Sequence, residues 1–535
     1  MSDTTPSPFA DRTALIIRRL AVVMTALAAT PATAQDIALG LGTAVTSLDP
    51  HFHNLASNIK ISMNVFEPLV DQDEHQRAVP DLASAWKTID DTTWEFTLRR
   101  GVRFHDGQEF GAEDVAATLR RVPWVPNSPN SFVTYTRAIT ETIIVDPYTV
   151  RFRTASPYPL LPNDLSSVEI VSRRYEHAPT ADFNNGQAAV GTGPFRFVAY
   201  LPGDRVTLQR NDAYWGVRPH WQNVTLRVIT SQPSRVAALL AGDVQAIDDV
   251  PPSDLAKLQS DPSVTVLRGP SNSVLFLHMD QFREQTPFAT DRSGAPLPSN
   301  PFKDRRVRMA ISKAINRAAI VDRVMEGAAV PAASLLAHGF FGSSPRLQPD
   351  TFDPEAARRL LTEAGYPNGF ALTIHGPIGR YVNDNLVLQA IAPMLVRVGI
   401  DTKVVVLPWA TFITQASAPT YAYSMLLIGN SATTGEASFG LRVQFATVDP
   451  QQGMGGSNRA RYSNPLVDEM LGRAMATIDD TKREALLQEV SEIAMHDQAI
   501  VPLFHQENIF AVRRGLQYTP RTDGYMAAYM IRPAN

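Results

Sequence analysis

The stretch WEFTLRRGVRFHDGQEFGAEDVAATLR, residues 94–120, decides how the first part of the chain folds. Its opening residues alternate between apolar and polar, which is typical of a half-buried β-strand. The FHDG that follows predicts a turn, because Asp106 and Gly107 are residues that turns favour. A helix is expected next, with Glu113 and Asp114 in its first turn, where the helix dipole favours negative charge. We therefore interpret the carboxylates as part of a strand–turn–helix unit and not as a catalytic or metal-binding cluster.

Comparable patterns recur along the chain and indicate an α/β fold. Strand-like alternation is found in residues 148–153, 195–200, 205–210 and 224–229. Two helices are predicted where a capping residue precedes a proline, at Asp353-Pro354 and at Asn464-Pro465. In the second of these helices the residues expected to face the core are Leu466, Val467, Met470, Leu471, Ala474 and Met475.

The composition is that of a large soluble protein with two or three lobes. Of its 535 residues, 44% are hydrophobic and 19% are charged, which suffices for substantial cores. The 49 basic and 53 acidic residues give no general attraction to nucleic acid or anionic lipid. The absence of cysteine excludes disulfides, thiolate metal sites and cysteine nucleophiles.

The N-terminus resembles a cleaved signal peptide spanning residues 1–34. Arg18 and Arg19 precede an apolar run over residues 20–29, and Ala32-Thr33-Ala34 fits the small-residue cleavage pattern. The run is too short to cross a bilayer, and no later segment reaches about 18 uninterrupted apolar residues. We expect an exported protein that is not embedded in the membrane.

Motifs for catalysis are mostly missing. The chain has no G-x-x-x-x-G-K-[ST], G-x-S-x-G or H-E-x-x-H, and neither a cofactor nor a catalytic residue is predicted. Ser84 and Lys87 match S-x-x-K, but the companion motifs S-D-N and K-T-G are absent. A secreted serine hydrolase that uses this pair is therefore kept only as an alternative.

Histidines are interpreted as structural. His105 has no second ligand at metal spacing, so a hydrogen-bonding role is expected. His51 and His53 alternate on one stretch and suit nickel, copper or zinc, but the other histidines are dispersed and no supporting carboxylate can be identified. No metal site is predicted.

Several short motifs occur in an order that carries a family resemblance. In sequence they are SLDPH, VFEPLV, VPDLASAW, the stretch quoted first, GTGPFRF, NDAYW, RVAALLAGDVQAIDDV, DRRVRMAISKAINRAAIV, ARRLLTEAGYPNGF and RYSNPLVDEML. This series, from Ser47 to Phe504, resembles the extracytoplasmic solute-binding proteins of family 5. Members of that family serve ATP-driven importers of dipeptides, oligopeptides, nickel and some opines or sugars.

The resemblance implies a two-lobed α/β periplasmic binding protein of the Venus-flytrap, class II-like type, with an extra domain inserted in the first lobe. The expected parts are first lobe 35–69, 190–275 and 490–535, extra domain 70–189, and second lobe 276–489. It further implies a monomer that closes on a small-molecule or peptide ligand in the periplasm and delivers it to permease subunits with separate ATPase subunits. Closure needs ligand contacts from both lobes.

By position in the family pattern, ligand-binding residues are expected in both lobes. Asn54 is the candidate in the first lobe. In the second lobe, Arg380 is expected to clamp a carboxylate, and Tyr381 and Trp409 to stack on the ligand or form its wall. A polar loop adds Asn430, Ser431 and Glu436 as candidates.

One departure from the family pattern concerns amine recognition. Peptide-binding relatives commonly place an Asp in this last loop, whereas the chain reads Gly429-Asn430-Ser431, and its nearest carboxylate is Glu436. A ligand without a free ammonium group is therefore plausible. Nickel-chelate, opine or sugar binding within the family, and a chaperone-like use of the cleft, stay open as alternatives.

Overall fold

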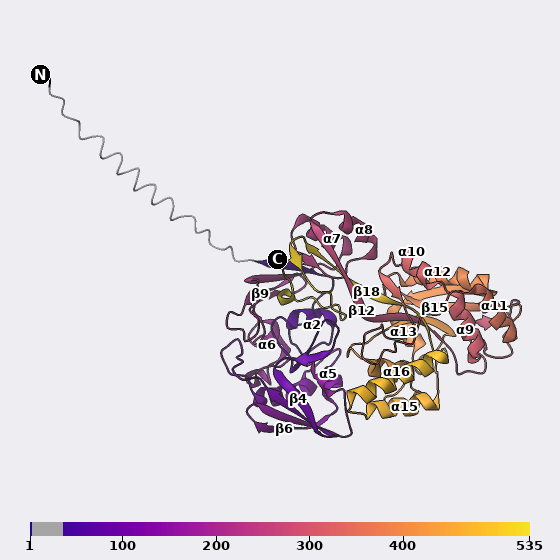
Figure 1. Ribbon diagram of the computed structural model, residues 1–535, viewed down its shortest axis with the longest axis horizontal. Helices are drawn as coiled ribbons and strands as arrows, with labels where there is room; N and C mark the ends of the chain where they lie inside the picture. The colour runs from indigo at the N-terminus through magenta and orange to yellow at the C-terminus, as the bar shows by residue number, and fades with distance from the viewer. Residues whose placement is uncertain (3–35, 535) are drawn as a thin grey trace.

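Two long strands link the two lobes of the molecule. In the computed structural model, which describes residues 1–2 and 36–534, β12 (Val264–Met279) and β18 (Val501–Arg513) pair antiparallel along most of their length. The pairing is irregular between Pro270 and Val274, near the middle of β12. In Figure 1 these strands run between the indigo and purple part of the molecule and the orange part. The predicted signal peptide lies almost wholly outside the described residues.

A twelve-stranded sheet extends through both lobes, in the order β13-β15-β17-β12-β18-β11-β1-β10-β9-β8, with β14 on β18 and β16 on β15. β1 is parallel to β10 and β11, and β15 is parallel to β16 and β17. Because β11 is antiparallel to β18 and β17 is antiparallel to β12, the carboxyl ends of both parallel sets point toward the middle of β12 and β18. The two lobes thus turn their carboxyl edges toward each other.

The strands of this sheet other than β12 and β18 are β1 (Ile37–Leu41), β8 (Phe195–Leu201), β9 (Arg205–Arg210), β10 (Asn223–Val228), β11 (Ala246–Ile247), β13 (Ala289–Thr290), β14 (Ala329–Pro331), β15 (Phe370–Ile378), β16 (Ile400–Pro408) and β17 (Met425–Ser431). The predicted strands at residues 195–200, 205–210 and 224–229 are confirmed as β8, β9 and β10.

A separate four-stranded antiparallel sheet, in the order β4-β5-β7-β6, forms the centre of the extra domain. The strands are β4 (Ala83–Asp90), β5 (Thr93–Leu98), β6 (Ile139–Asp146) and β7 (Thr149–Thr154). Its core contains Phe96, Phe104, Phe110 and Phe152, all fully buried. The short hairpin β2 (Val70–Gln72) and β3 (Ala78–Pro80) joins this domain to the first lobe.

The strand–turn–helix prediction for residues 94–120 is confirmed. After β5 and a turn, α3 (Ala112–Arg121) begins. The Gly111 amide donates to Asp114 Oδ2 at 3.0 Å, so Asp114 caps the helix. His105 Nε2 lies 3.0 Å from the Gly193 carbonyl oxygen, which is the structural hydrogen bond expected of this histidine.

Helices cover both faces of the sheet in the second lobe. One face packs on α9 (Arg305–Ala314), α10 (Arg317–Arg323), α11 (Pro354–Glu363) and α12 (Asp384–Arg397). The other packs on α13 (Trp409–Ala416), α14 (Ala437–Gln444), α15 (Pro465–Met475) and α16 (Asp480–His496). The remaining α-helices of the described residues are α2 (Ala56–Ser62), α4 (Val133–Thr136), α5 (Leu161–Leu165), α6 (Thr180–Asn184), α7 (Gln232–Ala241) and α8 (Leu255–Ser260).

The two helices predicted from their caps are α11 and α15. Asp353 Oδ1 accepts from the Ala356 amide at 2.8 Å, and Asn464 Oδ1 accepts from the Leu466 amide at 2.9 Å. The core-facing prediction for Leu466 is wrong, because this side chain is 50% exposed. It precedes Val467 and so lies off the stripe formed by Val467, Met470, Leu471 and Ala474, which is buried.

The expected lobe limits at residues 275/276 and 489/490 fall inside β12 and α16. Within residues 1–2 and 36–534, none of the helices has both the length and the apolar character needed to span a membrane.

Candidate ligand-binding site

The carboxyl edge of the second lobe brings most of the predicted site residues together. Arg380 and Tyr381 follow β15, Trp409 follows β16, and Asn430 and Ser431 end β17. In open α/β sheets, ligands bind outside the carboxyl ends of the strands, where the connecting loops leave a crevice. These side chains therefore stand where the fold favours a binding site.

A cavity of about 200 Å³ occupies this edge. Its lining residues come from β12, β17, β18 and the loop after β15, and they are Ser273, Val274, Leu275, Arg380, Tyr381, Gly429, Asn430, Ser431 and Gln506. Apart from the Arg380 guanidinium, the polar groups here are amides and hydroxyls. The cavity therefore suits a polar or anionic ligand group.

The Arg380 guanidinium lies over two aromatic rings. Its central carbon is 5.6 Å from the centre of the Tyr381 ring and 5.0 Å from that of Trp409. Among the residues that the structure describes, no carboxylate forms an ion pair with Arg380. Burial raises the pKa of Tyr381, so its hydroxyl stays protonated and able to donate. The cation is therefore oriented by the rings while its charge is left for a ligand.

A buried carboxylate fixes the backbone of this loop. The amides of Gly379, Arg380 and Tyr381 donate to Asp384 at 3.2, 2.9 and 3.0 Å. Asp384 begins α12 and is 3% exposed. Because one side chain holds three successive amides, the direction in which Arg380 leaves the loop is set before any ligand arrives.

The polar loop after β17 is held on both sides. Asn430 Oδ1 accepts from Gln444 Nε2 at 3.2 Å, and Ser431 Oγ lies 2.7 Å from Ser273 Oγ on β12. Further along, Asn163 Nδ2 of the extra domain donates to the Thr434 carbonyl at 3.1 Å. The segment that begins at the cavity with Asn430 and Ser431 is thus also in contact with the extra domain.

Glu436 and Asn54 are not brought to this cavity. Glu436 is 1% exposed, precedes α14, and accepts hydrogen bonds from Arg483 at 2.7 Å and Ser438 at 2.6 Å. Burial raises the pKa of Glu436. Asn54 Nδ2 donates to the Tyr135 hydroxyl at 3.0 Å, which ties it to the extra domain.

The residues of the S-x-x-K match and of the HFH stretch make structural contacts. Ser84 Oγ donates to the Thr97 carbonyl at 3.1 Å, whereas Lys87 Nζ lies 3.2 Å from Glu95 Oε1. Each side chain has a partner other than the second member of the pair, so Lys87 is not positioned to activate Ser84. His51 Nε2 lies 2.8 Å from the Glu169 carbonyl oxygen. Within residues 1–2 and 36–534 no group of three His, Asp or Glu side chains forms a metal site.

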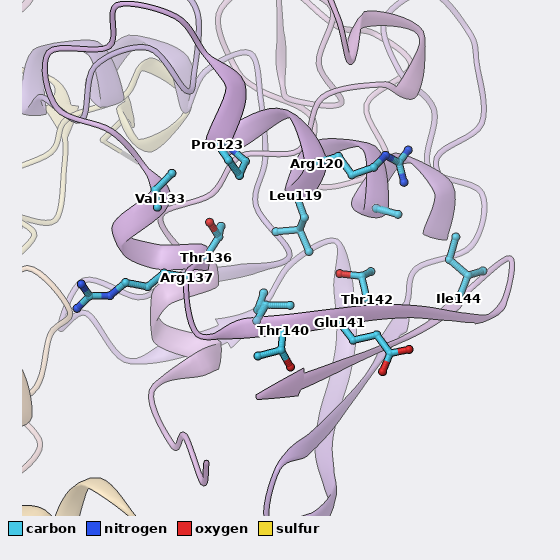
Figure 2. A pocket seen from close by; sticks show the side chains of 12 residues that line it. Leu119, Arg120, Pro123, Val133, Thr136, Arg137, Thr140, Glu141, Thr142 and Ile144 are labelled. Atoms are coloured by element: carbon cyan, nitrogen blue, oxygen red, sulfur yellow. The ribbon is translucent and has the colours of Figure 1, made fainter. Parts of the chain in front are cut away.

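The extra domain carries a larger hollow that lies away from the carboxyl edges. It has a volume of about 520 Å³ and lies between α3 and the edge strand β6 (Figure 2). Leu119 and Val133 contribute apolar surface, while Arg120 is engaged by Glu176 at 2.7 Å. None of the predicted site residues lines it, so we do not regard it as the ligand site.

Sequence reasoning missed a second cavity, of about 260 Å³, that adjoins the first and shares Ser273 and Gln506 with it. Its other lining residues are Gln232, Asp249, Val250, Pro251, Pro252, Ser271, Met325, Ala328, Val382, Glu507, Asn508 and Ile509. They come from both lobes and from the linking strands. A pair of aspartates directly after a short strand, as in AIDD, was the available signal.

A two-lobed α/β molecule with facing carboxyl edges and a polar cavity between them has the architecture of a solute-binding protein. The family described as "Bacterial extracellular solute-binding proteins, family 5 Middle" matches residues 77–450, and the chain belongs to this family.

Similar proteins cover almost the whole chain. The glutathione-binding protein GsiB of Salmonella choleraesuis (strain SC-B67) is 28% identical over 499 residues, which are 92% of this chain and 93% of that protein. HbpA2 from Haemophilus parasuis superposes with a TM-score of 0.81 at 22% identity and covers 94% of this chain and 100% of its own. DppA from Helicobacter pylori, in complex with the peptide STSA, gives a TM-score of 0.71 at 22% identity over 93% of this chain and 98% of its own.

Proposed function

We propose that the protein is the periplasmic substrate-binding component of an ABC importer and that it takes a peptide-like solute with a carboxylate. The observation that carries the proposal is the Arg380 guanidinium, stacked on Tyr381 and Trp409 beside a cavity and free of carboxylate partners among the described residues. A guanidinium oriented in this way binds a carboxylate with two parallel hydrogen bonds.

The similar proteins support a peptide-like ligand. One binds glutathione, which is a tripeptide, and another is described with a bound tetrapeptide. Export through the predicted signal peptide, function as a monomer and delivery to permease subunits with separate ATPase subunits complete the proposal. The ligand leaves the protein unchanged, so no bond is made or broken.

We propose that the hinge between the two lobes lies within β12 and β18. The irregular pairing between Pro270 and Val274 lies where the two carboxyl edges face each other. A bend there moves the second lobe without disturbing either core, since the core clusters of the two lobes lie on opposite sides of this segment. Contacts of the ligand with both lobes then favour the closed form.

Isothermal titration calorimetry with glutathione, the dipeptide Met-Leu and the tetrapeptide Ser-Thr-Ser-Ala tests the proposal. Saturable binding of at least one probe, with a smaller radius of gyration in solution scattering, is expected. A nickel chelate, an opine and a disaccharide are added because they represent the other ligand classes of the family. Binding of one of these alone, or accumulation of hydrolysis products from the peptides, would overturn the proposed ligand class or the absence of catalysis.

A further inference from the structure

The two adjoining cavities place opposite charges at two ends of one cleft. Arg380 lines the first cavity and Asp249 lines the second, and both cavities are lined by Ser273 and Gln506 on the linking strands. Each is smaller than a typical small-molecule site of about 300–1,000 Å³, but together they reach that range. Asp249 belongs to the first lobe and Arg380 to the second, so a ligand that reaches both contacts both lobes.

Asp249 is held at the carboxyl edge of the first lobe by a strained backbone. It is the second residue after β11 and has a φ of 49°, in the left-handed region that non-glycine residues rarely adopt. Arg235, fully buried, donates to the carbonyl oxygens of Ile229, Asp248 and Asp249 at 2.8, 3.1 and 2.7 Å. This guanidinium fixes the backbone of the corner, while the Asp249 side chain stays 57% exposed.

The charge of Asp249 is only partly compensated. Lys60 Nζ lies 2.5 Å from Asp248 Oδ2 but 3.6 Å from Asp249 Oδ2, so a single ammonium group serves two carboxylates and is closer to the buried one. Repulsion by Asp248 raises the pKa of Asp249. A cation that arrives from the cavity relieves this repulsion.

Other carboxylates near the cleft are already paired. Glu436 accepts from Arg483 and lies outside both cavities. Glu507 lines the second cavity but forms an ion pair with Arg268. Among the described residues that line the two cavities, Asp249 is therefore the carboxylate best placed to receive a cation from the ligand.

We propose that Asp249 binds the ammonium group of the ligand while Arg380 binds its carboxylate, so that the cleft selects a zwitterionic solute. The inference rests on the proposed function and deepens it. It also answers the question raised by Asn430 and Ser431: the amine is recognised from the first lobe and not from the loop after β17.

The test compares glutathione and Ser-Thr-Ser-Ala with their N-acetylated forms on wild-type protein and on Asp249→Asn. In the wild type, acetylation is expected to weaken binding about 10- to 100-fold, the usual effect of losing a hydrogen bond between charged groups. Asp249→Asn should bind the free and the acetylated forms equally, with the weak affinity of the acetylated form. Asp249→Glu keeps the charge and should keep the preference for the free amine.

Asp243→Asn is the matched control, because it removes an exposed carboxylate of the same lobe outside both cavities. Melting temperatures establish whether each variant folds. If Asp249→Asn does not fold, the preference of Asp249→Glu for the free amine tests the inference. Equal binding of free and acetylated probes to the wild type, or an unchanged preference in Asp249→Asn, overturns the inference and leaves the proposed function intact. If the wild type binds no probe of either kind, the proposed peptide-like ligand fails and the inference falls with it.

Discussion

The guanidinium carbon of Arg380 lies 5.0 Å from the centre of the Trp409 ring, although the two residues follow different strands of the second lobe. The pairing of β15 with β16, which is parallel from Phe370 to Ile378, brings them together at the sheet edge. The ring attracts the cation without neutralising it, since it carries no net charge. The ring thereby orients Arg380 beside the cavity.

Arg380→Gln should weaken binding of a carboxylate ligand about 10- to 100-fold, because one charge-assisted contact is lost. The same variant should bind a C-amidated tetrapeptide as well as the wild type does. Calorimetry with the Ser-Thr-Ser-Ala acid and its amide measures both effects. An equal loss for acid and amide would show that Arg380 contributes packing and does not recognise the carboxylate.

Trp409→Leu should weaken binding of the same acid by about 2- to 10-fold, since the cation–π contact that orients Arg380 is removed. Its effect should largely disappear in the Arg380→Gln background, because Trp409 acts through the guanidinium. A double-mutant cycle measures this coupling. Additive losses would instead assign Trp409 a direct contact with the ligand.

The sequence was most informative where structure is local. The strand, turn and capped helix of residues 94–120 depend on neighbours in the chain, and they form as expected. Arg380, Tyr381 and Asn430 were predicted from their positions in the family pattern, and the structure places them at the carboxyl edge of one sheet. Asp249 and Gln506 were missed because they meet only through the pairing of β11, β18 and β12, which involves residues hundreds of positions apart.

Glu436, which was predicted as a ligand-binding residue, is buried, and its structural role can be tested by measuring stability. Glu436 pairs with Arg483, 47 residues away along the chain, with both side chains below 5% exposure. Glu436→Gln leaves the buried Arg483 guanidinium with only the exposed Asp480 carboxylate as its partner, at 2.8 Å, and should lower the free energy of unfolding by about 1–3 kcal/mol. Denaturant titration measures the loss.

Glu436 lies outside both cavities. The ligand affinity of the folded Glu436→Gln variant should therefore stay within about 2-fold of the wild-type affinity. Arg483→Met is a useful partner variant, since combining it with Glu436→Gln removes both charges and should recover part of the stability. Large loss of affinity with unchanged stability would restore Glu436 as a ligand-binding residue.

The contact between the loop after β17 and the hairpin β2–β3 requires a glycine. Gly435 has a φ of 72°, and a Cβ atom there would lie 2.4 Å from the Gln76 carbonyl oxygen. Gly435→Ala should therefore displace the loop from the hairpin and lower the free energy of unfolding by about 1–3 kcal/mol. Gly453→Ala is the control, because its φ is also positive, at 68°, but no atom lies within 4 Å of the added Cβ. Thermal unfolding measures the stability of both variants. Equal destabilisation of the two would show that the effect comes from backbone conformation alone.

Asp164, beside that same contact, gives the protein a dependence on pH. Burial raises its pKa from 3.8 to about 7, and it accepts a hydrogen bond from the Tyr158 hydroxyl at 2.6 Å. The folded state keeps the proton up to about pH 7, whereas the unfolded chain releases it near pH 4, so stability falls as the pH rises through this window. The Asp164→Asn side chain cannot titrate. The slope of stability against pH between pH 4 and 7 should therefore be smaller in this variant, by up to about 1.4 kcal/mol per pH unit. Other buried carboxyls, such as Glu169, whose pKa burial also raises, contribute to the slope of both proteins and cancel in the comparison. Melting temperatures of wild type and variant over this range make the measurement, and parallel profiles would show that Asp164 is ionised in the folded protein at neutral pH.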